Sequence, residues 1–301
     1  MHRAFLISGL TLLGCPTDPV YPSCDDVLAL PSAPAQPSWH RDVRPLVERR
    51  CLRCHDQGGL ADLPLATYAD ASTWAEPAAR AVLARTMPPW TAADCCRPLR
   101  DVFGLDPIEI ATVSAWADAG APEGDPGDYV PPPPPEPALP RVDRTLSMPT
   151  AYTPALGEGE TDISRCFLLE WPEAEDRYVT GFAVRPGNPA IVHHVIALLA
   201  GPDVVAGFDA LDVADPGPGW TCPGGLAWGA TGWLGGWSPG WAGREIPDGL
   251  GHEVAAGSKV ILSVHYSVVA PDPAPDSTAL DLMLADSVSG TLESLSVYDP
   301  A

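Results

Sequence analysis

The stretch that decides the N-terminal part of the fold is Arg50-Cys51-Leu52-Arg53-Cys54-His55. It holds two cysteines three positions apart, directly followed by a histidine. Two thiols at this spacing can add to the two vinyl groups of a haem, and the next histidine can ligate the iron. A zinc site would need a second, suitably spaced ligand pair, and a thioredoxin-like motif would sit in a βαβ pattern; the sequence has neither. It therefore predicts one covalent c-type haem on this cysteine motif (residues 51–55).

A sixth iron ligand is predicted at Met87, which is followed by Pro88 and Pro89. The two prolines can hold a loop that presents the thioether, and Met/His ligation raises the reduction potential of the iron. The alternative is a methionine packed in the core, which the neighbouring prolines disfavour. His40 is another possible ligand, but it lies on the wrong side of the helix that leads into the motif. His40 is therefore expected to be a surface residue.

Two helices are expected around the cysteine motif. Apolar residues from Val43 to Val47 have helical spacing just before it. A second helix begins after Asp106, with Glu109 completing a capping box. This layout resembles the small class I cytochromes c over residues 38–128, so a small all-α haem domain is expected there.

The overall composition favours an acidic, exported protein. The 301 residues include 17 Lys and Arg against 39 Asp and Glu, for a formal net charge of −22. Such a surface repels phosphate backbones, so nucleic acid is not expected as a partner. Residues 16–37 are rich in Pro, Ser and Asp and indicate a tether. Five consecutive prolines at 131–135 mark a stiff linker over residues 129–144.

The first 15 residues indicate a targeting segment. A short basic start, His2-Arg3, precedes about ten mostly apolar residues, which are too few to span a bilayer. The run ends at a sequence that resembles a bacterial lipobox, with Cys15 as the residue to be lipidated. The alternative is ordinary cleavage of a signal peptide. The chain is expected on the periplasmic side of a bacterial membrane, anchored by the lipid on Cys15, or otherwise secreted.

The eight cysteines fit an oxidising compartment. Cys166 and Cys222 both lie in the second half, and they pair with each other if each domain keeps its own bridges. Cys95 and Cys96 are adjacent and disfavour a bond with each other. One of them can reach Cys24, which leaves the other unassigned.

Residues 145–301 have the pattern of a β-sandwich, with short β-branched runs broken by Gly and Pro. Strands are expected over residues 177–185, 190–199 and 259–269. The second carries His193 and His194, and the third carries His265 on a face with Ser263 and Ser267. Three imidazoles could bind copper or zinc, but a regular strand sends His193 and His194 to opposite faces, so joint ligation needs a bulge or a twist. The alternative has one histidine buried and the other solvated.

The second half also resembles the N-terminal half of the copper type II, ascorbate-dependent monooxygenases. The matching stretches are Ser164-Arg165-Cys166, Val192-His193-His194-Val195, Gly257-Ser258 and Val264-His265-Tyr266. The resemblance implies one copper bound by the paired and the single histidine, and a disulfide between Cys166 and Cys222. It also implies ascorbate or another redox protein as the electron donor or acceptor, and a small molecule or a peptide as substrate. The expected fold class is multidomain α + β: a small all-α class I cytochrome c followed by an antiparallel, jelly-roll-like β-sandwich.

One departure from this family bears on activity. Its second copper site uses a His-x-His pair and a methionine, whereas Met283 is the only candidate of these kinds after His265. We therefore expect a haem and copper redox protein, with haem relaying electrons to or from copper, that does not hydroxylate a substrate with these residues alone. The alternatives are a plain electron carrier and a binding or structural lipoprotein. His252 is expected in a surface turn, and the tryptophans between residues 220 and 241 are expected to pin a long loop.

Overall fold

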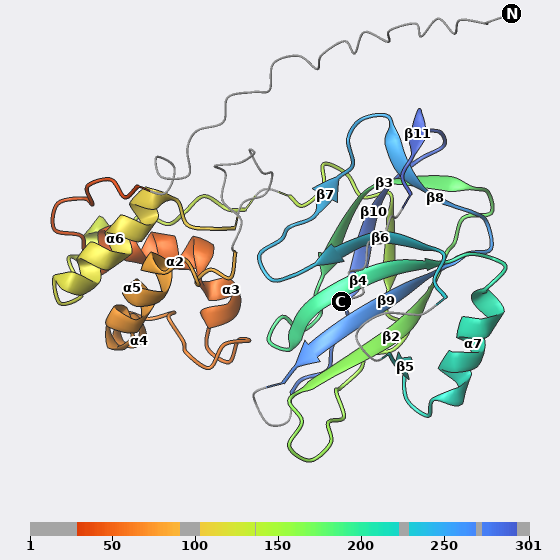
Figure 1. Ribbon diagram of the computed structural model, residues 1–301, viewed down its shortest axis with the longest axis horizontal. Helices are drawn as coiled ribbons and strands as arrows, with labels where there is room; N and C mark the ends of the chain where they lie inside the picture. The colour runs from red at the N-terminus through yellow and green to blue at the C-terminus, as the bar shows by residue number, and fades with distance from the viewer. Residues whose placement is uncertain (1–28, 91–102, 136, 223–228, 269–272, 294–301) are drawn as a thin grey trace, which may run out of the picture.

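The computed structural model describes residues 29–90, 103–135, 137–222, 229–268 and 273–293 (Figure 1). In these ranges a helical region comes first, and two β-sheets follow it. The predicted signal peptide with Cys15, most of the tether, and Cys24, Cys95 and Cys96 lie outside the described residues. No helix among the described residues is long and apolar enough to cross a membrane.

The helices of the first region are short. They are η1 (Trp39–Val43), α2 (Arg44–Arg50), α3 (Leu52–His55), α4 (Tyr68–Thr73), α5 (Ala75–Leu83), α6 (Pro107–Asp118) and the 3₁₀ turn η2 (Pro126–Asp128). The predicted capping box of α6 is confirmed: the Asp106 side chain accepts from the Glu109 amide, and the Glu109 side chain accepts from the Asp106 amide. These contacts satisfy backbone donors that a helix start otherwise leaves unpaired.

Two small apolar clusters hold this region together. One surrounds the rings of Trp39 and Trp116, whose centroids are 6.0 Å apart. The other joins Leu46 to Val82 and to residues of α6. Cys51 packs against both clusters, so the cysteine motif lies where they meet.

The strands form two sheets. The first, in the order β1-β10-β3-β8-β11 with β7 also on β3, contains β1 (Arg144–Ser147), β3 (Arg177–Arg185), β7 (Arg244–Glu245), β8 (Leu250–Val254), β10 (Ala279–Ala285) and β11 (Gly290–Thr291). The second, in the order β5-β2-β9-β4-β6, contains β2 (Asp162–Glu170), β4 (Val192–Ala200), β5 (Trp220–Thr221), β6 (Gly232–Trp237) and β9 (Lys259–Ser267). The strands predicted at 177–185, 190–199 and 259–269 are present as β3, β4 and β9, although β4 begins two residues later than predicted, β9 ends at Ser267, and residue 269 lies outside the described residues.

The main core lies between the two sheets. Phe167, Val195 and Val264 of the five-stranded sheet share one apolar cluster with Val179 and Leu282 of the six-stranded sheet. Burying this apolar area removes it from water and is the main stabilising contribution to the pair of sheets.

Part of the outer face of the five-stranded sheet is covered as well. Helix α7 (Val205–Ala214) packs there through Phe208, beside Trp220 and Ile261. The face of β9 that the sequence predicts to be polar is therefore buried at Ile261 and Ser263, and it is half-buried at His265 and Ser267. A strand buried on both faces reads as a continuous apolar run, which explains why alternation alone misjudged this face.

The predicted fold class is wrong. The structure is mostly β, with two sheets of five and six strands, and the described residues are 23% helical. Among the described residues no small all-α class I cytochrome c domain is evident, because the five α-helices of the first region span only four to twelve residues each. The physical reason lies in the connections: residues 56–67 form no helix, and Pro88 and Pro89 follow shortly after α5. In residues 129–143 the described part forms neither helix nor strand.

Candidate metal centre and cysteine motif

Three of the four histidines of the second half, His193, His194 and His265, meet at a β-bulge. Strand β4 pairs with β9 so that Val192 lies opposite Tyr266 and His194 lies opposite His265, and the register shifts between them. His193 is thus the additional residue of the bulge. Val192 and Tyr266 are fully buried in the main core and hold both strands in place. The bulge supplies the irregularity that joint use of His193 and His194 requires.

The bulge brings three ring nitrogens together. The Nδ1 atom of His193 lies 3.2 Å from that of His194 and 3.1 Å from that of His265, and the last two are 3.2 Å apart. The three nitrogens are close enough together that they would hold one ion jointly, at the usual metal–imidazole distance of about 2.0–2.1 Å. We call these three residues the histidine cluster.

A carboxylate orients one member of the cluster. Asp162, at the start of β2, places Oδ1 at 3.1 Å from Nε2 of His265. Since a carboxylate only accepts, Nε2 of a neutral His265 carries the proton and its Nδ1 is left as a bare lone pair facing the other rings. A carboxylate behind a ligating imidazole is a common support for a metal site because it fixes the ring and its tautomer.

Electrostatics lower the pKa of two members of the cluster. Burial, together with the nearby rings of His265 and His193, lowers the pKa of His194 to about 4. Burial and His193 also lower the pKa of His265, although Asp162 opposes the shift. Neutral imidazoles are the form that ligates metals. The three Nδ1 atoms face one another, and each could give a lone pair to a shared cation, so the donor set fits a metal ion.

The cluster is accessible from one side. His193 is exposed, while His194 and His265 are half-buried. Three nitrogen ligands on a half-buried surface leave coordination positions open for water or a small ligand. Among the described residues, this is the one group of three His, Cys, Asp or Glu side chains whose ligand atoms lie within 4.8 Å of one another.

The predicted disulfide between Cys166 and Cys222 is present, with a Cα–Cα distance of 5.8 Å. The disulfide lies in the apolar cluster beneath α7, beside Trp220. It links β2 to the residue after β5, so it braces the strand that carries Asp162.

The cysteine motif contains two free thiols and one imidazole that is oriented by a hydrogen bond. Cys51 and Cys54 are not bonded to each other. The Nδ1 atom of His55 lies 2.7 Å from the carbonyl oxygen of Leu63. A carbonyl can only accept, so Nδ1 donates the proton and Nε2 remains bare for a metal.

The thiols are protonated in their surroundings. Burial, reinforced by the charge of Glu109, raises the pKa of Cys51 to about 12, and burial also raises that of Cys54. Reactive redox cysteines and thiolate metal ligands have lowered pKa values, so this environment disfavours both uses. It does not oppose thioether formation with haem vinyl groups in an apolar setting.

Met87 lies in a turn, and His40 is more buried than predicted. Met87 is 43% exposed and follows α5. His40 is not a surface residue, as its side chain is only 12% exposed and Nε2 lies 3.6 Å from Glu123. The chain after α6 returns past η1, where the backbone amide of His40 donates to Glu123, and this covers the ring.

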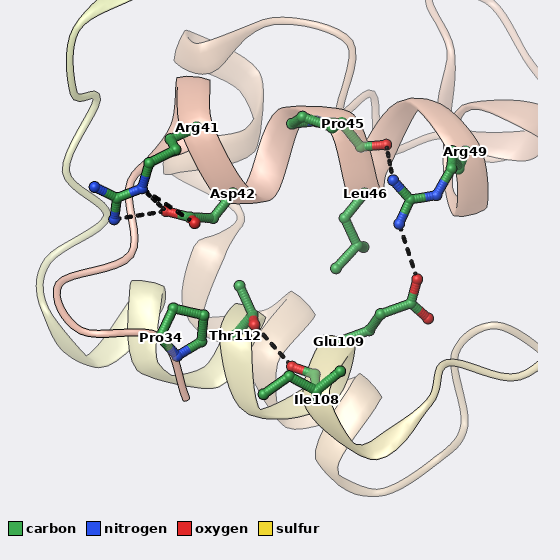
Figure 2. A pocket seen from close by; sticks show the side chains of 9 residues that line it. All are labelled: Pro34, Arg41, Asp42, Pro45, Leu46, Arg49, Ile108, Glu109 and Thr112. Carbon is green, nitrogen blue, oxygen red and sulfur yellow. Dashed lines mark hydrogen bonds and ion pairs between the residues drawn. The ribbon is translucent and has the colours of Figure 1, made fainter. Parts of the chain in front are cut away.

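A pocket of about 280 Å³ lies between α2 and α6 (Figure 2). Arg49 and Glu109, which both line it, form an ion pair of 3.0 Å, and Leu46 of α2 lines it as well. Its lining contains neither the cysteine motif nor Met87, so it is not the predicted haem position.

No protein-family model matches the chain, and no curated protein matches it either. Function is therefore argued from the two sites.

Sequence reasoning missed several neighbours of these sites. Asp162 and Leu63 carry no local signal, because their partners come from another strand or from a carbonyl whose position depends on the loop fold. His252 lies in β8 opposite Val179, half-buried rather than in a surface turn. Trp237 belongs to β6 rather than to a loop, although it packs on the main core.

Proposed function

We propose that this chain is an exported redox protein that holds one copper on the histidine cluster and one c-type haem on the cysteine motif. The observation that carries the proposal is the convergence of three Nδ1 atoms at 3.1–3.2 Å from one another. Each of these nitrogens can give a lone pair to one shared cation when the proton of its ring sits on Nε2. The convergence arises from a bulge whose neighbouring residues are fully buried, so it is built into the sheet.

Sites made of imidazole nitrogens differ in their affinity for divalent metals, and this difference favours copper over zinc. Divalent copper binds a given imidazole site more tightly than zinc does. No thiolate or carboxylate lies among the three converging donor atoms, so the site would be of type 2, without the intense blue band of a copper–thiolate bond. The resemblance to copper type II, ascorbate-dependent monooxygenases points the same way.

Haem is supported by the chemistry of residues 51–55. Both thiols are free, and the imidazole of His55 is oriented by Leu63 so that one nitrogen remains available. We propose Met87 as the sixth ligand, which requires the turn after α5 to close over the haem.

Each group, when bound, can change its oxidation state by one electron. The residues around the two sites set how tightly they are held: Asp162 and the bulge for copper, Leu63 and the flanking apolar clusters for haem. We propose ascorbate or another redox protein as the electron donor or acceptor, a small molecule or peptide as the possible substrate, and a membrane anchor through a lipid on Cys15.

A second candidate is an electron carrier without oxygenase chemistry. His252 lies in β8, while Met283 is buried against Leu139 and Ala183. Both residues belong to the six-stranded sheet, whereas the histidine cluster lies on β4 and β9 of the five-stranded sheet.

The test is to produce the full chain in a host with c-type maturation and to measure both groups. The proposal predicts haem absorbance that stays with the protein after acid-acetone extraction, and one copper per chain. Histidine-to-alanine changes in the cluster should remove the copper alone. Extractable haem, or copper that survives those changes, would refute the respective assignment.

A further inference from the structure

The cysteine motif contacts the sheets through Arg53. This residue lies between the two cysteines, on α3, and its guanidinium donates a hydrogen bond to the carbonyl oxygen of Gly240. Helix α3 lies on the side of the helical region that faces the sheets (Figure 1). The contact joins positions 187 residues apart.

The loop at Gly240 is shaped for close approach. Gly240 has φ +103°, which side-chain-bearing residues rarely adopt. A Cβ placed there would lie 2.7 Å from Nη1 of Arg53 and 3.1 Å from the ring of Phe103. Phe103 is itself held edge-on by Trp90, at 5.5 Å between ring centroids. Arg53 and Phe103 therefore approach Gly240 from two parts of the helical region, so closely that a side chain would not fit there.

The other side of the same loop belongs to the sheet that carries the histidine cluster. Trp237, three residues before Gly240, pairs with Val195, which directly follows His194. Trp241, directly after Gly240, packs against the main core with its ring 5.4 Å from that of Phe182. The loop is thus anchored on both sides of the glycine.

We propose that the contact between Arg53 and Gly240 is an internal docking contact, and that Arg53 is a positioning residue that holds the cysteine motif against the loop beside the histidine cluster. The inference rests on the proposed function, since its purpose is a fixed spacing between a haem and a copper. An arginine suits this task because its planar guanidinium presents several donors to a carbonyl while remaining accessible to water.

Two readouts test the docking on the full chain. The first is amide hydrogen exchange of residues 232–243, which needs neither group to be bound. The variants are Arg53→Ala, Arg53→Lys and Gly240→Ala. Arg80→Ala is the matched control, because Arg80 pairs with Glu76 within the exposed face of α5. Loss of one such hydrogen bond predicts about fivefold faster exchange in Arg53→Ala and a similar rise in Gly240→Ala.

The second readout is the haem–copper distance distribution from pulsed electron paramagnetic resonance, on protein loaded with both groups. We expect a narrow distribution in the wild type and in Arg80→Ala, a broad one in Arg53→Ala, and partial recovery in Arg53→Lys. Wild-type exchange in both Arg53→Ala and Gly240→Ala would overturn the docking contact. Failure to bind haem or copper would instead refute the proposed function, while the exchange result would still decide the docking.

Discussion

Replacing Asp162 by alanine removes the carboxylate behind His265 and leaves the three ligating rings in place. The carboxylate stays ionised at neutral pH, because a hydrogen bond from Thr161 and the nearby imidazoles lower its pKa against the opposing effect of burial. In the variant, Nε2 of His265 loses its acceptor at 3.1 Å, and the ring can rotate or take the other tautomer. Either change costs metal affinity without touching a ligand atom.

The magnitude follows from the exposure of this pair. Loss of a supporting carboxylate behind a metal-ligating histidine costs roughly 10–100-fold in affinity. The Asp162 side chain is 51% exposed, so water can replace part of what it supplies. We therefore expect the lower end, about tenfold in the dissociation constant of copper, which corresponds to about 1.4 kcal/mol.

The assay is a competitive copper titration against a chelator of known affinity, at pH 7. Asp162→Asn separates charge from hydrogen bonding, because the amide oxygen can still accept from His265, and it should fall between the wild type and alanine. Asp203→Asn is the matched control, as it removes the same charge from an exposed site nine residues beyond His194. Equal affinities for wild type and Asp162→Ala would refute the orienting role of the carboxylate.

Further changes have distinct expected outcomes. His265→Ala should abolish stoichiometric copper, which metal analysis of the folded variant would show. The urea concentration at the unfolding midpoint should stay within about a few tenths of 1 M of the wild-type value, because the His265 ring is only half-buried near the end of β9. Met87→Ala should leave haem attached but lower its reduction potential by potentiometric titration, and an unchanged low-spin spectrum would mean a different sixth ligand. In metal-free protein, the unfolded chain takes up a proton at His194 near pH 6.5, whereas the folded protein does so only near pH 4. The free energy of unfolding should therefore fall as pH drops through this window, and the fall should be smaller in His194→Phe.

The sequence predicts strands well where apolar runs are long, and it predicts α6 because its capping box is local. It does not predict the fold class, since the cysteine motif suggests a small all-α cytochrome domain, whereas the helices are short and residues 56–67 between two of them form none. The outer face of β9 was misjudged because α7, far along the chain, covers Ile261.

The sequence predicts the residues of the histidine cluster but not the geometry that brings them together. The three residues are visible in the sequence, but the bulge that lets His193 and His194 act together depends on pairing with β9. Asp162 and the contact between Arg53 and Gly240 join distant segments, so no spacing along the chain indicates them.

The most direct test of the account is the electron paramagnetic resonance spectrum of the full chain after addition of one equivalent of divalent copper. The account predicts a single type 2 species with hyperfine coupling to imidazole nitrogens, which is lost in His265→Ala. A spectrum of free aqueous copper in the wild type, or the same bound species in His265→Ala, would contradict it.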